Sequence, residues 1–328
     1  MPRFDFARFL NIRNAFSPSP SPDGSRIAFL CDITGVPQVW GVPARGGWPE
    51  QLTFYPERVA TVEYSPIGDR VLFGMDAGGD ERQGLYSVTP DGAEIRPLAV
   101  APDVIHSWGA WSPDGARIAY TSNARDRRYF DVYVRPLDGE PRLALRHDGM
   151  NEVAAWSPDG GSLLLSRTNE RYSDNDLYLL DLASGEARLL TAHSGEAAHQ
   201  GAHFSGLDSL LLLTNRDREF LAPARLDLRS GALEFLADTA WDAEELAASE
   251  DGWVVAYTVN EDGRSRLSLE ADGVQRRVAG LPDGVIAGLK LSADGSLLVF
   301  TLYAPTRNGN VWAVDTATGE AWQVTSAS

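Results

Sequence analysis

The sequence has a single cysteine, Cys31, and a single lysine, Lys290, among its 328 residues. One cysteine cannot form a disulfide within the chain, so nothing in the composition requires an oxidising compartment. The formal net charge is −17 and no run of basic residues occurs, which argues against nucleic acid and anionic membrane surfaces as partners. The first residues carry charges where a secretory signal needs an unbroken apolar stretch. We therefore expect a cytoplasmic protein, unless a signal has been removed.

Several signatures of chemistry are also missing. No Gly-x-Ser-x-Gly segment occurs, so the sequence offers no nucleophile elbow. The glycine pattern of phosphate-binding loops is absent as well. Ser194 beside His193 and Ser205 near His203 are neighbours in sequence only, whereas a triad is defined by its arrangement in space. We expect no catalytic residue, no cofactor and no metal in this chain.

What the sequence has in abundance is one phrase, Ser-Pro-Asp-Gly. It is complete at residues 21–24, 112–115 and 157–160, looser copies begin at Ser65, Ser249 and Ser292, and a degraded copy begins at Ser205. The intervals between these seven serines are 44, 47, 45, 48, 44 and 43 residues. Proline, aspartate and glycine in this order favour a tight turn between two strands. The chain is therefore an array of repeats.

Each repeat contains four short apolar runs. One precedes the Ser-Pro-Asp-Gly turn, one follows it, and two more flank a second tight turn such as Asp138-Gly139 or Ser184-Gly185. Second runs such as residues 163–165 and 297–300 are apolar on both faces, as a sheet between two neighbouring sheets requires. No segment of helical length shows a period of 3.6 residues, which excludes helical repeats. We predict an all-β fold, a seven-bladed β-propeller with four antiparallel strands per blade.

The predicted propeller spans residues 15–328 and follows an N-terminal arm, residues 1–14. The blades are expected at approximately residues 15–53, 59–99, 104–145, 151–191, 200–237, 242–279 and 285–325. Each blade supplies its own four strands, so we expect the ring to close by side-chain packing between blades one and seven. The arm carries an apolar stripe of Phe4, Phe6, Phe9, Leu10 and Ile12. This stripe would either cover the seam between those blades or dock on another domain.

The strand order sorts the loops onto two faces. Tight turns between the first and second and between the third and fourth strands share one face. The loops between second and third strands, the connectors between blades and both chain ends share the other, which we call the long-loop face. Because binding residues favour irregular loops held on a rigid scaffold, the long-loop face is the expected binding surface.

Mixed-charge segments recur on the long-loop face, at residues 80–82, 125–128, 216–219 and 261–264. They would be either solvated surface or a collar of charges at a domain interface or channel lip. The candidate interface or gating residues are Glu57, Arg58, Asp80, Glu81, Arg82, Arg125, Arg127, Arg128, His193, Glu196, Arg216, Arg218 and Glu219.

His193, His199, His203 and Glu196 form the densest group of possible metal ligands. Their spacing would suit a site if residues 199–203 were helical. The simpler interpretation is a set of polar residues on a long connector between blades four and five.

Several segments carry a family resemblance: residues 33–40 (Ile-Thr-Gly-Val-Pro-Gln-Val-Trp), 46–49 (Gly-Gly-Trp-Pro), 51–53, 176–182 and 217–221, together with the Trp-Ser-Pro-Asp-Gly repeats. With these segments the chain resembles the N-terminal propeller of bacterial prolyl oligopeptidase-family serine peptidases, particularly the acylaminoacyl-peptidase or dipeptidyl-aminopeptidase-like branch. The Ser-Pro-Asp-Gly phrase alone is less specific, because periplasmic TolB-type propellers share it.

The resemblance implies a non-catalytic propeller that covers an α/β-hydrolase domain, admits short peptides and excludes folded proteins. In that family the hydrolase domain carries the Ser-Asp-His triad, and no position of this sequence matches a triad residue. The implied partner is the hydrolase domain. The alternatives are a stand-alone TolB-like scaffold that binds a protein partner, and a propeller enzyme with its own carboxylate or metal site.

Overall fold

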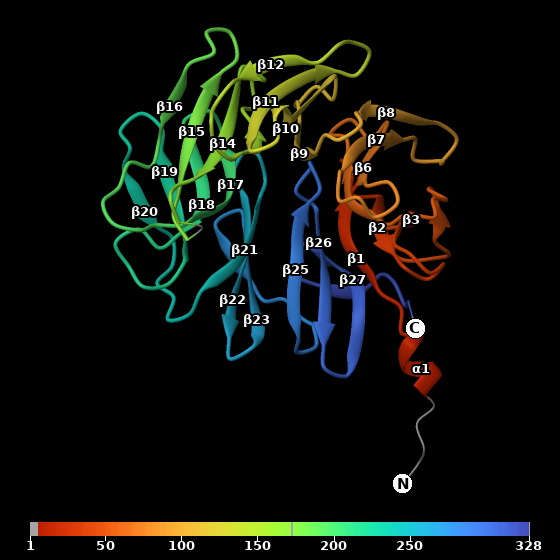
Figure 1. The fold of residues 1–328 in the computed structure, drawn as a ribbon. Helices are drawn as coiled ribbons and strands as arrows, with labels where there is room; N and C mark the ends of the chain where they lie inside the picture. Colours follow the sequence, from red (N-terminus) through yellow and green to blue (C-terminus); the bar gives the residue numbers. More distant parts are fainter. Residues whose placement is uncertain (1–5, 172, 328) are drawn as a thin grey trace.

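The computed structural model describes residues 6–171 and 173–327, in which seven four-stranded antiparallel sheets form a ring (Figure 1). The strands of each sheet follow one another in sequence order. One short helix, α1 (Phe6–Leu10), precedes the first sheet in this part of the chain. The predicted seven-bladed, all-β propeller is confirmed.

Blade one consists of β1 (Ala15–Pro20), β2 (Arg26–Cys31), β3 (Gln38–Pro43) and β4 (Glu50–Gln51). Blade two consists of β5 (Val59–Tyr64), β6 (Val71–Met75), β7 (Gly84–Val88) and β8 (Ile95–Ala99). Blade three consists of β9 (His106–Trp111), β10 (Arg117–Asp126), β11 (Tyr129–Pro136) and β12 (Arg142–Leu145). Blade four consists of β13 (Asn151–Trp156), β14 (Ser162–Thr168), β15 (Asn175–Asp181) and β16 (Ala187–Leu189).

Blade five consists of β17 (His199–Ser205), β18 (Ser209–Thr214), β19 (Ala222–Asp227) and β20 (Leu233–Phe235). Blade six consists of β21 (Ala243–Ala248), β22 (Val254–Glu261), β23 (Arg264–Ala271) and β24 (Val274–Arg276). Blade seven consists of β25 (Val285–Leu291), β26 (Leu297–Ala304), β27 (Arg307–Asp315) and β28 (Ala321–Gln323). At most blade interfaces the first strands of the two blades contact one another, and β9 of blade three contacts β7 of blade two. The first strands therefore line the inside of the ring.

The Ser-Pro-Asp-Gly turns are stabilised by a recurring set of hydrogen bonds. In blade three, Ser112 Oγ donates to Asp114 Oδ1 over 2.5 Å and accepts from Arg117 N over 2.9 Å. Gly115 has a φ of +67°, which other residues adopt only at a cost. The same serine-to-aspartate bond forms at Ser21, Ser157, Ser249 and Ser292. The repeated sequence therefore forms the same hydrogen-bonded turn between the first two strands of these blades.

Two blades depart from this phrase in different ways. In blade two, Ile67 replaces the aspartate, and Ser65 Oγ donates instead to Asp69 Oδ1 over 2.6 Å. The serine–aspartate bond is thus kept, but the aspartate lies four residues after the serine instead of two. In blade five the turn has no such aspartate, and Ser209 Oγ donates to the carbonyl oxygen of Ser205 over 2.8 Å.

We expect acid to destabilise the propeller through these turns. The Ser21 hydroxyl is the main cause that lowers the pKa of Asp23 to about 2, and serine hydroxyls likewise lower the pKa of Asp114 and Asp159. In the unfolded chain an aspartate has a pKa of about 3.9. Because the folded pKa is lower, the chain takes up protons when it unfolds in acid. The stabilisation is complete above about pH 5 and is lost as the pH falls towards 2.

Urea unfolding midpoints, measured from about pH 6 to about pH 3, should fall steadily. Ser157→Ala removes the hydroxyl that lowers the pKa of Asp159. The variant should therefore be less stable than the parent at neutral pH and show a shallower acid dependence. Parallel curves for parent and variant would contradict this explanation.

All seven first strands pair with the second strand of their blade through a register shift in the described structure. A bulge of this kind leaves one residue unpaired and changes the direction of the side chains around it. In β17 the shift lies between Gln200 and His203, and Gly201 there has a φ of +55°. The bulge determines where the two histidines of this strand point.

Blades one and seven meet through side chains, since the sheet order shows no strand shared between them. A buried cluster joins Phe29 and Val42 of blade one to Val299 of blade seven. Trp322 Nε1 donates to the carbonyl oxygen of Ala44 over 2.8 Å across the same seam. The expected closure by packing agrees with this arrangement.

Candidate functional site

The long-loop face holds both ends of the described chain. In Figure 1 the chain leaves the ring through α1 near the C-terminal label, and Ala15 and Ala327 belong to the same buried cluster. The backbone beyond α1 is fixed to two blades, because Asn14 N donates to Asp32 Oδ1 over 2.7 Å and Gly309 N donates to Asn14 Oδ1 over 2.9 Å. The arm therefore leaves the ring from a fixed point between blades one and seven.

The apolar side chains of the arm face solvent. Phe6 is 74% exposed and Leu10 is 65% exposed, and Phe9 and Ile12 are exposed as well. Phe4 lies outside the described residues. The structure does not place the four described side chains over the seam, so that expectation is wrong for them. In the described part of the chain, no helix combines the length and the apolar character needed to cross a membrane.

Arginines at the loops between second and third strands pair with acids on the connector that ends the same blade. The pairs are Arg82–Asp103, Arg125–Asp148 (2.8 Å), Arg171–Glu196, Arg218–Asp238 (3.0 Å) and Arg264–Asp283 (3.1 Å), one in each of blades two to six. Most of these side chains are exposed, so each pair contributes little to stability. Their effect is to hold each loop against the following connector.

Arg125 is held from two sides. Its Nε lies 2.6 Å from Asp131 Oδ2, and its Nη2 lies 3.0 Å from Asp131 Oδ1 and 2.8 Å from Asp148 Oδ1. Asp131 is completely buried in β11 and also accepts a hydrogen bond from His147 N over 3.1 Å. Burial would raise the pKa of Asp131, but the bonds from Arg125 and His147 outweigh it and lower the pKa. A buried anion thus fixes the loop and the connector of blade three together.

The other candidate residues have fewer contacts. Arg128 pairs with Asp126 of its own loop at 2.9 Å, Arg127 approaches Asp103 at 3.9 Å, and Asp80 Oδ1 accepts a hydrogen bond from Arg82 N over 2.9 Å. Within residues 6–171 and 173–327, no ion pair forms at Glu57, Arg58, Glu81, Arg216 or Glu219. Arg58, Glu81 and Glu219 are exposed. These charges remain accessible on the long-loop face.

The predicted group of three histidines and Glu196 is not brought together. Residues 199–203 belong to strand β17 and are not helical, so the condition for that group is not met. His203 Nε2 lies 3.0 Å from the carbonyl oxygen of Leu246 on the neighbouring first strand. Glu196 pairs with Arg171. Because the bulge in β17 separates His199 from His203, these two side chains have different surroundings.

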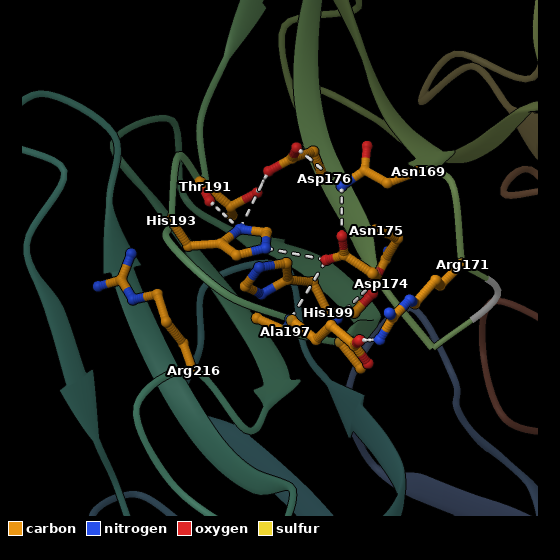
Figure 2. Close-up of polar contacts among 12 residues, drawn as sticks. Asn169, Arg171, Asp174, Asn175, Asp176, Thr191, His193, Ala197, His199 and Arg216 are labelled. Carbon is orange, nitrogen blue, oxygen red and sulfur yellow. Dashed lines mark hydrogen bonds and ion pairs between the residues drawn. The ribbon is translucent and has the colours of Figure 1, made fainter.

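The structure instead groups His193 and His199 with Asp176 of β15, and their donor atoms lie within 4.8 Å of one another (Figure 2). His193 lies between two aspartates: its Nε2 is 2.9 Å from Asp174 Oδ1 and its Nδ1 is 3.4 Å from Asp176 Oδ1. Burial would lower the pKa of His193, but its hydrogen bonds to the Thr191 carbonyl and the Asp174 carboxylate, together with the charges of Asp176 and Asp174, raise it. Burial lowers the pKa of His199 to about 4.

Sequence reasoning missed both Asp174 and Asp176. A signal was available, because side chains two positions apart on a strand share a face. Asp174 and Asp176 flank Asn175, the first residue of β15, so this spacing alone would place the two side chains on one face. What the sequence could not show is that the connector carries His193 back onto this strand.

The face formed by the tight turns opens into a cavity of about 450 Å³. Glu63, Trp108, His203 and Lys290 are among its lining residues. Lys290 of β25 pairs with Glu63 of β5, and Ser19 Oγ donates to Glu63 Oε1 over 3.2 Å. An ion pair between blades two and seven therefore lies at this end of the ring.

No family model matches the chain. One solved prolyl endopeptidase superposes with a TM-score of 0.76 at 16% identity, covering 97% of this chain and 50% of that chain. A Mycobacterium tuberculosis puromycin-hydrolyzing peptidase superposes with a TM-score of 0.77 at 16% identity, covering 96% of this chain and 53% of that chain. The chain thus spans about half the length of these peptidases.

A curated relative is the Tol-Pal system protein TolB of Nitrosomonas europaea. It is 34% identical over 136 residues, which are 39% of this chain and 31% of TolB. The fold and these comparisons define the class, a seven-bladed propeller. Within that class, the likeness predicted from the sequence is confirmed for the fold: the structural neighbours include the propeller domains of prolyl oligopeptidase-family peptidases.

Proposed function

We propose that this chain is the non-catalytic propeller of a prolyl oligopeptidase-family serine peptidase of the acylaminoacyl-peptidase or dipeptidyl-aminopeptidase-like kind. Its propeller, residues 15–328, docks an α/β-hydrolase domain and limits access to short peptides in the cytoplasm. The observation that carries the proposal is the position of both chain ends and the exposed arm on one face (Figure 1). A domain joined to either end meets that face.

The chemistry of the long-loop face supports docking. Ile33 in blade one, Phe54 on the connector after it and Trp241 before blade six are exposed apolar side chains there, in addition to those of the arm. Five loop arginines, Arg82, Arg125, Arg171, Arg218 and Arg264, are already paired with connector acids, so covering these five does not bury an isolated charge. Apolar anchors inside a polar rim are typical of domain and protein interfaces. We assign the candidate charges of the collar to that rim.

The opposite end of the ring supports the gating part of the proposal. The cavity there is bordered by the tight turns, which the serine–aspartate bonds hold in place. A peptide that enters along the axis passes the Lys290–Glu63 pair. A cavity of about 450 Å³ is far too small to hold a folded protein, so only a short or extended segment could enter it.

Polar substitutions in the arm test the docking surface. In the full reading frame, Phe6→Ser with Leu10→Ser should weaken the contact between the domains and raise the hydrolysis of long substrates relative to dipeptides several-fold. In the isolated propeller the same change should alter stability by no more than about 0.5 kcal/mol, because the side chains are exposed. Peptidase assays and urea unfolding measure the two effects.

Ile67→Ser with Trp253→Ser is the matched control, since both side chains are exposed on the tight-turn face. This variant should keep the length preference of the parent. Docking through the long-loop face is ruled out if the control changes that preference and the arm variant does not.

The second candidate function is a stand-alone TolB-like scaffold that binds a protein partner through the same face, and the identity shared with TolB favours it. A reading frame that continues past Ser328 into a Gly-x-Ser-x-Gly segment supports the peptidase, and a stop codon there supports the scaffold. Both candidates require that the purified chain hydrolyses no peptide substrate. Fluorophosphonate-sensitive turnover would instead reveal a triad within the chain.

A further inference from the structure

We propose that Asp176, His193 and His199 bind a divalent transition-metal ion of the Zn²⁺ class. The three side chains come from β15 of blade four, the connector between blades four and five, and the first residue of β17 in blade five (Figure 2). Each offers one donor atom, and these atoms lie within 4.8 Å of one another. Two imidazole nitrogens and one carboxylate oxygen suit zinc, whereas Mg²⁺ and Ca²⁺ prefer oxygen donors only.

The spacing of two donors already fits a bound ion. His193 Nδ1 and Asp176 Oδ1 are 3.4 Å apart. Two ligands of a tetrahedral zinc ion, each 2.0 to 2.2 Å from the metal, lie about 3.4 Å apart. The present separation of these two atoms therefore suits an ion between them, and His199 is the third member of the group.

Each of the three side chains also has a partner on the side away from the proposed ion. His193 Nε2 contacts Asp174 Oδ1 at 2.9 Å, and Asn169 Nδ2 donates to Asp176 Oδ2 over 3.2 Å. His199 Nδ1 lies 2.9 Å from Thr214 Oγ1. A carboxylate on the far nitrogen of a ligand histidine fixes its ring orientation and its tautomer, and such second partners are typical of metal sites.

A second, independent observation is the unsatisfied nitrogen of His199. This residue is only 3% exposed, and its Nε2 has no hydrogen-bond partner. A buried polar atom without a partner costs free energy, so it calls for an explanation. Since Nδ1 already contacts Thr214, Nε2 is the atom left for a ligand. A metal ion beside His193 and Asp176 supplies that partner.

Thr191 holds two of the proposed donor atoms while no ion is bound. Its carbonyl oxygen lies 2.9 Å from His193 Nδ1, and its Oγ1 donates to Asp176 Oδ1 over 3.0 Å. A bound ion replaces these two hydrogen bonds. The free Nε2 of His199, in contrast, has no hydrogen bond to lose.

Three protein donors leave one position of a tetrahedral ion open. A cavity of about 540 Å³ is lined by His193, Ser194, Arg216 and Asp217, among others, so solvent reaches the His193 side of the group. A water molecule from this cavity would complete the coordination. The ion would then link blade four to blade five at the long-loop face, independently of what docks there.

The test uses the whole chain, stripped with a chelator and titrated with ZnCl₂ in a calorimeter. We expect one Zn²⁺ per chain with a micromolar or tighter Kd that excess Mg²⁺ does not change. Asp176→Asn keeps the shape of the side chain and removes its charge, and it should weaken zinc binding at least about tenfold. His193→Gln should do the same. Zinc should raise the Tm of the parent and not that of Asp176→Asn.

Glu196→Gln and His203→Gln are the matched controls, because these residues belong to the same stretch of sequence but not to the group. Both should bind zinc as the parent does. The proposal is overturned if the parent shows no saturable binding, if Asp176→Asn binds with unchanged affinity, or if the controls lose binding to the same extent. A circular dichroism spectrum matching the parent confirms that each variant is folded.

Discussion

Asp131→Ala lowers the free energy of unfolding by about 3 kcal/mol, the low end of the cost of removing one partner from a buried ion pair. The carboxylate is completely buried, accepts two hydrogen bonds from the Arg125 guanidinium and one from His147 N, and has no contact with water to replace them. The variant leaves the amide of His147 without its acceptor. Arg125 retains Asp148 and partial exposure, which limits the loss. Urea unfolding at neutral pH measures the effect.

Asp148→Ala is the matched control, because this aspartate contacts the same guanidinium from the solvent side. An exposed partner contributes little, so the control should change stability by less than about 1 kcal/mol. Asp131→Asn should lie between the two variants, since the amide keeps the volume but not the charge. Equal losses for Asp131→Ala and Asp148→Ala would show that burial of Asp131 does not determine the cost.

The fold could be predicted from the sequence because its information is local and repeated. Ser112, Asp114 and Gly115 form one turn within a few residues, and the same turn returns at each blade. Where the sequence of the turn changes in blade two, the serine still donates to a carboxylate, that of Asp69. The period of the phrase then gives the number of blades.

For the mixed-charge segments, the sequence predicted the face on which they lie but not which charges pair with one another. Arg82 and Asp103 are separated by two whole strands, and the pairing depends on how the connector returns to its own blade. Charges such as Asp80 and Arg82, in contrast, are near neighbours in the chain. In the structure they interact mainly through the backbone amide of Arg82.

The predicted grouping of three histidines with Glu196 is wrong because of the backbone geometry of β17. A helix would bring residues four apart onto one side, and so would a regular strand. The bulge at Gly201 breaks that regularity, so His199 faces Thr214 and the connector while His203 contacts Leu246. Gly201, with a φ of +55°, is the residue type that marks a bulge in this strand, but a glycine alone does not show which way the flanking side chains turn.

Phe29→Ala lowers the free energy of unfolding by about 3–5 kcal/mol, as expected for truncating a buried phenylalanine. Phe29 lies in the cluster that closes the ring between blades one and seven, where it is as well buried as Phe73 is between blades one and two. Since no strand is exchanged across the seam, this packing and hydrogen bonds such as those from Trp322 to Ala44, from Ser17 to Thr301 and from Gly309 to Asn14 keep the ring closed. The loss should appear in a single cooperative urea transition.

Phe73→Ala is the comparison that gives this result its meaning. If the seam is a blade interface like the others, Phe29→Ala and Phe73→Ala lower the free energy of unfolding equally, within about 1 kcal/mol. Trp48→Ala is the control: Trp48 of blade one is 90% exposed, so its truncation should lower the free energy of unfolding by almost nothing. A seam that opens easily would already expose Phe29 in part of the population, so its truncation would then cost much less than that of Phe73. Hydrogen exchange of the β2 and β26 amides checks the result independently. If the two variants lose equal free energy of unfolding, these amides should exchange slowly. If Phe29→Ala loses much less, they should exchange faster than the amides of the other blade interfaces.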